Sequence, residues 1–368
     1  MSPAIPLTRD AAPTGRAPFH GRFQAVRRRA MAWLVQRMFP SQGNLVGVGD
    51  LPRYGIQRIL VCRPNHRLGN TVLMTPLMCE LERHYPGAEV DVLASGNGAR
   101  SVYGGFATLG ELFLLHRRAA RRPLETIGVL RRLRSRRYDL VIDAASGSSS
   151  GRMTAAIARA RHQLRVDDFE DGMPTHFAGR AVHALRRALG DEAIVPTPRP
   201  DLRLTDAERR TSQDTLRRVL HNTDNSVPVL AIFPNATGAK RLDEAWWRSF
   251  LDTLLGELGP RRVVELVAAD GVSRVGNTWP TYFTSDPRKL AAFIEAAGTY
   301  VSADCGVMHL AAATQATTIG LFGATDPQRY APYGGGNTGF ACEDGCPVRT
   351  AKRVASHLKH QVGDSGIM

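Results

Sequence analysis

The sequence predicts an α/β protein built from two Rossmann-like domains that face each other across a cleft. In each half of the chain, short apolar runs alternate with amphipathic helices, as in parallel sheets covered by helices. The proline-rich stretch Ala193–Asp201 separates the halves and is typical of an interdomain linker. The length of 368 residues provides enough material for two cores. We therefore expect a ligand to bind in the cleft between the domains.

The first predicted domain spans residues 55–192 and contains four strands. Each is a short, largely apolar run of the kind found in buried parallel strands; the runs are Arg58–Arg63, Glu89–Ala94, Leu112–Leu115 and Tyr138–Asp143. Helices are predicted over Asn70–Tyr85, where Pro86-Gly87 ends the pattern, and over the arginine-rich segment Pro123–Arg137.

The second predicted domain spans residues 202–335 and repeats the alternation. Its predicted strands are Val227–Phe233, Arg262–Val267, Tyr300–Ser302 and Thr318–Phe322. Its predicted helices are Asp206–Asn222, Glu244–Leu258 and Pro287–Ala297. A tail, 336–368, is glycine-rich and then basic, and its role cannot be derived from its pattern.

The first fifty residues carry two distinct patterns. Residues 1–18 lack an apolar core and are predicted to be a disordered arm. Within the basic segment 19–50, Phe19–Pro40 places apolar residues at helical spacing with arginines largely on the other face. Such a helix either lies on an anionic membrane or packs on the domain with solvated arginines.

The charge balance is strongly basic, with 48 Lys and Arg against 34 Asp and Glu, a net charge of +14. A basic surface favours acidic partners such as nucleic acid, anionic lipid or phosphorylated sugars, although a G+C-rich genome also produces excess arginine. No nucleic-acid-binding motif is present, so no nucleic acid partner is expected. Nine arginines lie between Arg117 and Arg137, either as a docking surface for a membrane or glycolipid or as a solvated helix.

The predicted cellular location rests on the apolar runs and the cysteines of the sequence. No apolar run reaches the roughly 18 residues of a membrane-spanning helix, so we expect a cytoplasmic protein, peripheral on the inner membrane at most. Five scattered cysteines fit a reducing compartment. Cys342 and Cys346 flank Glu-Asp-Gly and are able to bind a metal or oxidise, but without a second pair no metal site is predicted.

The stretch Tyr300–Tyr333 suggests a binding site for a phosphate-bearing ligand. A strand gives way to a helix at Asp304, and the first turn of that helix offers free backbone N–H groups to an anion. The candidate donor-side residues in this stretch are Asp304, Cys305, Gly306, Val307, Met308, His309, Gly323 and Thr325. Asp304 has an alternative role as the helix N-cap, and His309 as a residue that only fixes the turn.

A second phosphate contact is expected in the loop Pro234–Leu242, which follows a strand. Lys240 places an ammonium group there, and Thr237 and Gly238 add a hydroxyl and backbone N–H groups. The alternative is a solvated loop lysine. The chain contains no Asp-x-Asp triplet to hold a metal ion, so protein groups would have to hold a diphosphate.

Four blocks in order resemble glycosyltransferase family 9, the ADP-heptose:lipopolysaccharide heptosyltransferase family. They are R-I-L-V-C-R-P-N-H-R-L-G-N-T-V-L-M-T-P-L, Y-D-L-V-I-D, I-F-P-N-A-T-G-A-K-R-L-D-E-A-W-W, and the final stretch with D-C-G-V-M-H-L-A-A-A and F-G-A-T-D-P. Together they cover about Ile56–Tyr333. The resemblance implies a GT-B fold and an inverting, metal-independent transfer without a cofactor. The implied partners are a nucleotide-sugar donor, ADP-heptose above all, and a phosphorylated glycolipid or other glycan acceptor such as the lipopolysaccharide core.

One residue departs from the family pattern at the position expected to supply the catalytic base. The family commonly has Gly-Asp where this chain has Gly69-Asn70, and an amide has no useful basicity near neutral pH. Either Asn70 orients the acceptor while another group, such as His66, takes the proton, or transfer proceeds with weak base help, or it has been lost. Asn70 would also suit a helix cap.

The predicted catalytic and acceptor-side residues follow from this comparison. The candidate catalytic residues are Asn70, His66, Lys240 and Asp304, and the candidate acceptor-binding residues are Arg63, His66, Arg67, Gly69 and Asn70. The arginines are expected to bind an anionic acceptor. The alternatives are transfer of another sugar to a different acceptor, or a catalytically silent nucleotide-sugar-binding protein.

Overall fold

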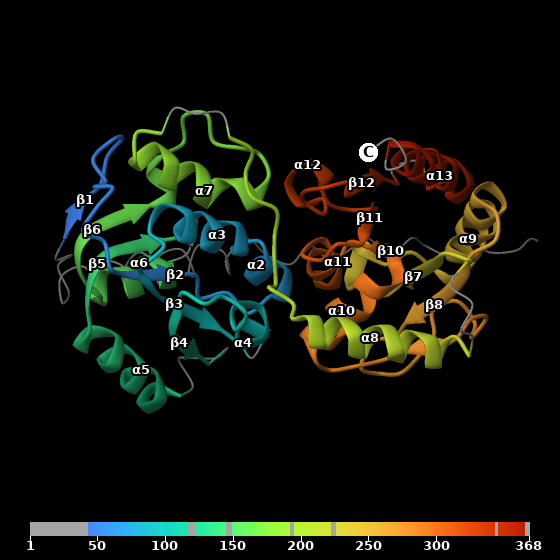
Figure 1. Ribbon diagram of the computed structural model, residues 1–368, viewed down its shortest axis with the longest axis horizontal. Coiled ribbons are helices and arrows are strands. Elements are labelled where there is room, and N and C mark those ends of the chain that lie inside the picture. Colours follow the sequence, from blue (N-terminus) through green and yellow to red (C-terminus); the bar gives the residue numbers. More distant parts are fainter. Residues whose placement is uncertain are drawn as a thin grey trace, which may run out of the picture.

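The computed structural model describes residues 43–96, 98–116, 122–144, 149–191, 195–221, 226–342 and 345–364. Two α/β domains lie side by side and are joined by an extended segment before helix α8 (Figure 1). The predicted arm and the predicted helix Phe19–Pro40 lie outside the described residues, as do Arg117, Arg118 and Arg121. Within the described part of the chain, no helix is long and apolar enough to cross a membrane.

The N-terminal domain contains a parallel sheet of six strands in the order β1-β6-β5-β2-β3-β4. Their bounds are β1 Asn44–Leu45, β2 Arg58–Cys62, β3 Glu89–Ser95, β4 Leu109–Leu115, β5 Arg137–Asp143 and β6 Arg159–Arg165. The accompanying helices are α2 Leu68–Val72, α3 Thr75–His84, α4 Gly98–Tyr103, α5 Pro123–Ser135, α6 Ser149–Ile157, the 3₁₀ turn η2 Val166–Asp168, and α7 Phe177–Ala188.

The C-terminal domain contains a second six-stranded parallel sheet, in the order β12-β11-β10-β7-β8-β9. Its strands are β7 Val229–Phe233, β8 Arg262–Leu266, β9 Thr281–Tyr282, β10 Gly298–Ala303, β11 Thr317–Phe322 and β12 Thr338–Ala341. Its helices are α8 Asp206–Val219, the 3₁₀ turn η3 Gly238–Lys240, α9 Glu244–Leu258, α10 Pro287–Ala297, α11 Gly306–Ala312, α12 Pro327–Tyr330 and α13 Pro347–Asp364.

Both sheets reverse their strand order at one point, and these switch points determine where a ligand binds. In the N-terminal sheet, successive strands run outward on either side of the β2–β5 pair; in the C-terminal sheet, they do so on either side of β7–β10. In open α/β sheets, ligands occupy the crevice beyond the carboxyl ends of the strands at such a point. A ligand is therefore expected at the carboxyl ends of β2, β5, β7 and β10.

Side-chain caps explain why several helices begin at the predicted residues. Asp243 accepts a hydrogen bond from the Trp246 N–H at the start of α9, and Asp286 caps α10 ahead of Pro287. Thr205 and Glu208 form a reciprocal capping box at the start of α8. Each cap satisfies backbone N–H groups that the first helical turn leaves without partners.

The structure adds strands β1, β6 and β9, which the sequence did not predict, and it departs from the predicted elements in two further regions. The single helix expected over Asn70–Tyr85 is two helices, α2 and α3, separated at Leu73 and Met74. The region 336–368, for which the sequence predicted no element, contains β12, which pairs with β11, and α13. Figure 1 shows α13 lying beside α9 on the outer face of the C-terminal domain.

The two domains contact each other directly as well as through the linker. Buried residues of α10 and α11, including Ala291 and Leu310, belong to the same apolar cluster as the core of the N-terminal domain. Arg288 of α10 donates to the carbonyl oxygens of Ser101 (3.1 Å) and Leu202 (2.8 Å) and to the Glu208 carboxylate (2.6 Å). These contacts fix the relative position of the two switch points.

Candidate functional site

An ion pair spans the switch point of the C-terminal sheet. Lys240 ends the 3₁₀ turn in the loop after β7, and Asp304 directly follows β10, the neighbouring strand. The Lys240 Nζ lies 2.7 Å from the Asp304 Oδ2, and the Asp304 side chain is only 5% exposed whereas that of Lys240 is 34% exposed. The carboxylate thus holds the ammonium group at the rim, where it remains accessible to an anion.

Thr325 completes this cluster from the third neighbouring strand. It lies in the loop after β11, and its hydroxyl donates a hydrogen bond to the same Asp304 Oδ2. Gly323 is exposed in that loop, as are Thr237 and Gly238 in the loop after β7. Of the predicted residues in these loops, Lys240 and Thr325 contact the Asp304 carboxylate. The alternative role of Asp304 as a helix cap is not seen, since the N-cap of α11 is Cys305, without a side-chain cap bond.

The start of α11 has no side-chain oxygen cap. The backbone N–H groups of Val307 and Met308 point at the Cys305 sulfur, a weak acceptor, which an anionic ligand would replace. They begin immediately beside the ion pair. The Cys305 thiol is held protonated at neutral pH, because burial raises its pKa to about 11. The turn consequently presents hydrogen-bond donors and no negative charge of its own beyond the carboxylate of Asp304.

His309 is buried one turn into α11, with 6% of its surface exposed. Burial lowers its pKa to about 4; Asp304 acts in the opposite direction, while His176 and Lys240 lower it further. The imidazole is therefore neutral at pH 7. Its Nδ1 is buried without a hydrogen-bond partner among the described residues, so one polar atom of this ring remains open to a ligand or water.

The N-terminal domain places the start of α2 against the start of α11. A Cβ built on Gly69 would lie 2.5 Å from the His309 Cδ2 and 3.4 Å from the Gly306 Cα. Only a residue without a side chain allows this approach. The Gly69-Asn70 segment, predicted to face the acceptor, therefore lies next to the predicted donor turn, although the two are distant in sequence.

Asn70 occupies the third residue of α2 and is half-buried. It is not the helix cap that its residue type suggested, because Arg67 holds the N-cap position and makes no side-chain cap bond. The Asn70 amide is therefore not needed to begin the helix. Asn70 directly follows Gly69, the residue that approaches the other domain.

The other predicted acceptor-side residues differ in how freely they face solvent. Arg63 donates to the Ala144 carbonyl oxygen at the end of β5, and burial lowers the pKa of its guanidinium group while Tyr103 and the two carboxylates Asp143 and Asp167 raise it. Its Nε is buried without a partner in the described structure. His66 and Arg67 are exposed in the loop after β2. Of the three, Arg63 is the one held in a fixed position.

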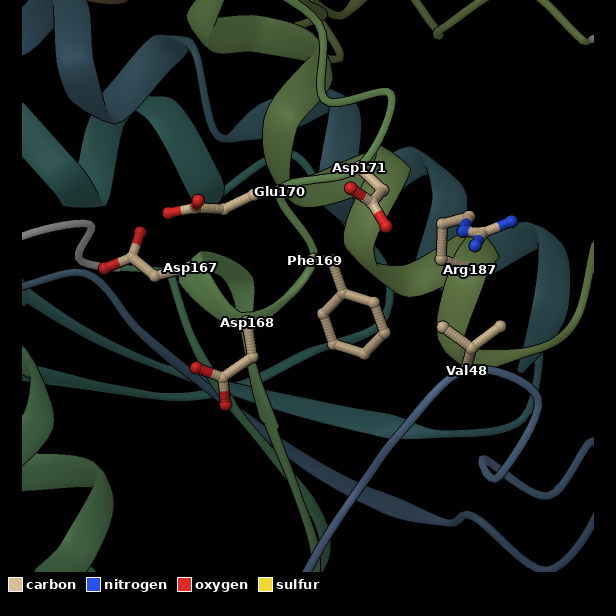
Figure 2. Close-up of a pocket in the computed structure, with 7 residues that line it drawn as sticks. All are labelled: Val48, Asp167, Asp168, Phe169, Glu170, Asp171 and Arg187. Atoms are coloured by element: carbon tan, nitrogen blue, oxygen red, sulfur yellow. The ribbon is translucent and has the colours of Figure 1, made fainter.

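A cavity of about 360 Å³ lies beyond the carboxyl end of β6. Figure 2 shows Asp167 and Glu170 on one side of Phe169, and Arg187 and Val48 on the other. The cavity is lined by Val48, Asp167, Asp168, Phe169, Glu170, Asp171 and Arg187. The sequence analysis did not single out these residues. Four carboxylates against one guanidinium group favour hydroxyl or cationic groups over phosphate at this end of the domain.

Sequence reasoning also missed the aromatic contacts that bridge the domains beside α7. The His176 Nε2 lies 2.9 Å from the Ala331 carbonyl oxygen, while its Nδ1 accepts from the Ala178 N–H. The His176 ring stacks on Tyr333 and Phe177 stacks on Tyr330, with centroids 4.8 and 5.1 Å apart. Such pairs join residues more than 150 positions apart, so no local pattern signals them.

The described residues contain no group of three or more His, Cys, Asp or Glu side chains placed to hold a metal ion. Cys342 is buried at the end of β12, and Cys346 precedes α13. The two are not joined by a disulfide bond in this structure.

Comparisons with known proteins agree with this geometry. Residues 288–357 match the family model for glycosyltransferase family 9 (heptosyltransferase). This match runs from α10 into α13 and includes the turn at Asp304. No curated protein matches the chain at the level of sequence.

Solved structures resemble the whole two-domain architecture. The E. coli heptosyltransferase WaaC with ADP has a TM-score of 0.64 at 19% identity, covering 83% of this chain and all of that one. A family 9 glycosyltransferase from Veillonella parvula has a TM-score of 0.65 at 16% identity, covering 84% and 91%. E. coli ADP-heptose lipopolysaccharide heptosyltransferase II has a TM-score of 0.60 at 17% identity, covering 84% and 100%. The GT-B fold and the resemblance to family 9 predicted from the sequence are thus confirmed.

Proposed function

We propose that this protein is an inverting, metal-independent glycosyltransferase. It would move a heptose or related sugar from a nucleotide-diphosphate sugar, with ADP-heptose as the favoured donor, to a lipopolysaccharide core or similar glycan. The observation that carries the proposal is the ion pair of Lys240 and Asp304 with Thr325 at the C-terminal switch point. A cationic group held by a buried carboxylate beside uncapped N–H groups suits a leaving diphosphate.

In this proposal, each domain contributes one half of the reaction. The bond between the anomeric carbon and the diphosphate oxygen breaks, and Lys240 together with the first turn of α11 takes up the developing negative charge. Inversion requires the acceptor hydroxyl to attack from the opposite face of the sugar. The close packing of Gly69 on Gly306 and His309 supports this arrangement, because it brings the acceptor-side helix to the donor turn.

The fate of the acceptor proton is the point at which this chain differs from the family pattern. The Asn70 Oδ1 is able to accept a hydrogen bond from the hydroxyl but not to keep its proton at neutral pH. We propose that Asn70 orients the acceptor and that His66, exposed in the preceding loop, or solvent takes the proton. The alternative is a silent nucleotide-sugar-binding protein, and Asn70 is the observation that favours it.

A transfer assay separates these functions. The protein is incubated with ADP-heptose and lipopolysaccharide-core acceptors that lack the heptose, and product formation and ADP release are followed together. The proposal predicts a glycosylated product with inverted anomeric configuration by NMR. Binding of ADP-heptose without product, across acceptors, would instead establish the silent protein, and transfer of a different sugar would replace the donor assignment. A His66→Ala variant that retains the full rate would exclude His66 as the base.

A further inference from the structure

Helix α5 presents an exposed stripe that contributes nothing to the core. The exposed fractions of Leu124 and Ile127 are 84% and 44%, and Arg131 is also exposed. Their spacing of three and four residues puts all three on one face of the helix. The opposite face packs inward through Val129, Leu130 and Leu133. These three side chains are therefore not part of the domain core.

The path of α5 orients this stripe relative to the cleft. The helix connects the carboxyl end of β4 to the amino end of β5, so it runs along the outside of the sheet from the cleft edge to the far edge. Figure 1 shows it standing out from the body of the N-terminal domain. The two apolar residues lie in its first half, toward the cleft edge, and Arg131 lies further from it.

Two residues beyond the end of α5, Arg137 is one of three arginines that line a pocket. Arg137 and Arg159 are direct neighbours across β5 and β6. With Arg161 they line a cavity of about 330 Å³, together with Tyr138 and Ala160. Arg161 is paired with Asp139 at 3.5 Å. Arg137 and Arg159 have no acidic partner among the described residues.

Acidic side chains near the stripe are already neutralised. Glu125, the carboxylate in the first turn of α5, lies 2.9 Å from the Arg122 guanidinium group. Glu111 on β4 pairs with both Arg132 and Arg136. The charge that remains on this face is therefore positive, and guanidinium groups form charge-assisted hydrogen bonds with phosphate.

We propose that the face formed by Leu124, Ile127, Arg131, Arg137 and Arg159 docks on an anionic lipid bilayer. Apolar side chains beside uncompensated arginines are the combination that helices lying in a membrane interface use. Leu124 and Ile127 enter the acyl boundary, and the arginine-lined pocket receives a headgroup phosphate. This inference goes beyond sugar transfer and needs no donor site. It places the α5 side of the N-terminal domain against the bilayer, and this is the domain proposed above to bind the acceptor.

Vesicle flotation with the full-length protein tests the docking face. Wild type is expected to float with vesicles of phosphatidylglycerol and phosphatidylethanolamine, to remain unbound with phosphatidylcholine alone, and to bind less at high salt. The triple variant R131E/R137E/R159E should lower partitioning by about tenfold or more, since each arginine near the surface contributes about 1 kcal/mol. The double variant L124D/I127D should lower it by about as much, because it removes the apolar side chains that enter the bilayer interface. Their melting temperatures and ADP affinities should match wild type.

Matched variants on the C-terminal domain serve as controls. V272D/F283D changes two residues that are 49% and 48% exposed, and R210E/R261E/K352E makes the same change in charge. Both should bind vesicles like wild type. The basic segment 19–50 is a second candidate source of membrane affinity, so every variant is also made in an R27E/R28E/R29E background. In that background, α5 variants that float as well as their parent, or control variants that lose binding to the same extent, would overturn the proposal. If a triple variant fails to fold, R131E alone decides, because Arg131 has no ion pair among the described residues.

Discussion

The two domains share the order of five strands around a switch point but differ in the chemistry of those switch points. In the C-terminal domain, Lys240, Asp304 and Thr325 form a closed cluster around a buried carboxylate. In the N-terminal domain, the corresponding edge carries Asn70, a guanidinium group bound to a backbone carbonyl, and an acid-lined cavity. A diphosphate is chemically the same in every nucleotide sugar, whereas acceptors differ. The comparison therefore suggests that the donor half has fixed chemistry and that the acceptor half is where this chain is specialised.

Removing the ammonium group from the donor cluster should have the largest effect. In Lys240→Ala, the Asp304 carboxylate loses its cation and the diphosphate loses its charged contact. We expect transfer to fall by about 10² to 10³-fold, the usual cost of deleting one donor that stabilises a developing anion. The measurement is kcat/KM with donor varied. Lys352→Ala, on the exposed face of α13, is the matched control and should retain the wild-type rate. Equal activity of the two variants would remove Lys240 from the site.

The donor half should also dominate the loss of stability in mild acid. The pKa of His309 is about 4 in the folded protein against an ordinary value of 6.5, because burial disfavours the imidazolium. The unfolded chain therefore binds a proton at a higher pH than the folded one, and stability falls as pH drops from about 6.5 to 4. The expected loss is about 3 kcal/mol, from about 1.36 kcal/mol per pKa unit.

A neutral replacement isolates this contribution. His309→Gln keeps a polar side chain that does not titrate, so its free energy of unfolding should change less over the same pH range. Urea unfolding at pH 7 and pH 4.5 provides the comparison. The carboxylates of the protein contribute equally to the pH dependence of the unfolding free energy in the variant and in wild type, so they cancel. An identical pH dependence in variant and wild type would show that His309 is not the group responsible.

Restoring a carboxylate tests the acceptor half. In Asn70→Asp, a group able to accept the proton replaces one that only hydrogen-bonds. We expect transfer to rise by about tenfold or more, toward the 10² to 10⁴-fold that general bases contribute. The pH profile of the rate should also change, because the added carboxylate must be deprotonated to act as a base. An unchanged rate and profile would mean that the proton leaves by a route that does not involve this position.

The contact between the two halves should be sensitive to one methyl group. In Gly69→Ala, the new Cβ would lie 2.5 Å from the His309 ring, so α2 and α11 must move apart. We expect kcat to fall by roughly tenfold through misplaced reacting groups, with ADP affinity little changed. Gly87→Ala is the control, because a Cβ there meets nothing within 4 Å. A Gly69→Ala enzyme that behaves like the control would show that this contact does not position the halves.

Predictions from the sequence succeeded where local chemistry decides the structure. Helices α9 and α10 begin and end at the predicted residues, because Asp243 and Asp286 cap them and Gly259 and Gly298 follow them with positive φ angles. The buried strands were also identified from their apolar runs. Strand β6, R-A-R-H-Q-L-R, was missed because charged residues conceal its pattern.

The site was only partly predictable for a related reason. The residue types of Lys240 and Asp304 indicated phosphate chemistry, but their ion pair depends on β7 and β10 being neighbours in the sheet. The approach of Gly69 to His309, across 240 positions of sequence, depends on how two domains dock. The acid-lined cavity combines a loop after β6 with Val48 and Arg187. Contacts between distant segments are set by packing, and no local pattern carries them.

The most direct test of the central claim is nucleotide binding at the C-terminal switch point. Isothermal titration calorimetry of the wild-type protein with ADP, UDP and GDP measures it without any assumption about the acceptor. The account predicts saturable binding of a nucleoside diphosphate, tightest for ADP, that Lys240→Ala weakens strongly and Asn70→Asp leaves unchanged. Absence of binding by all three nucleotides would contradict both the transferase and the silent-binder interpretations.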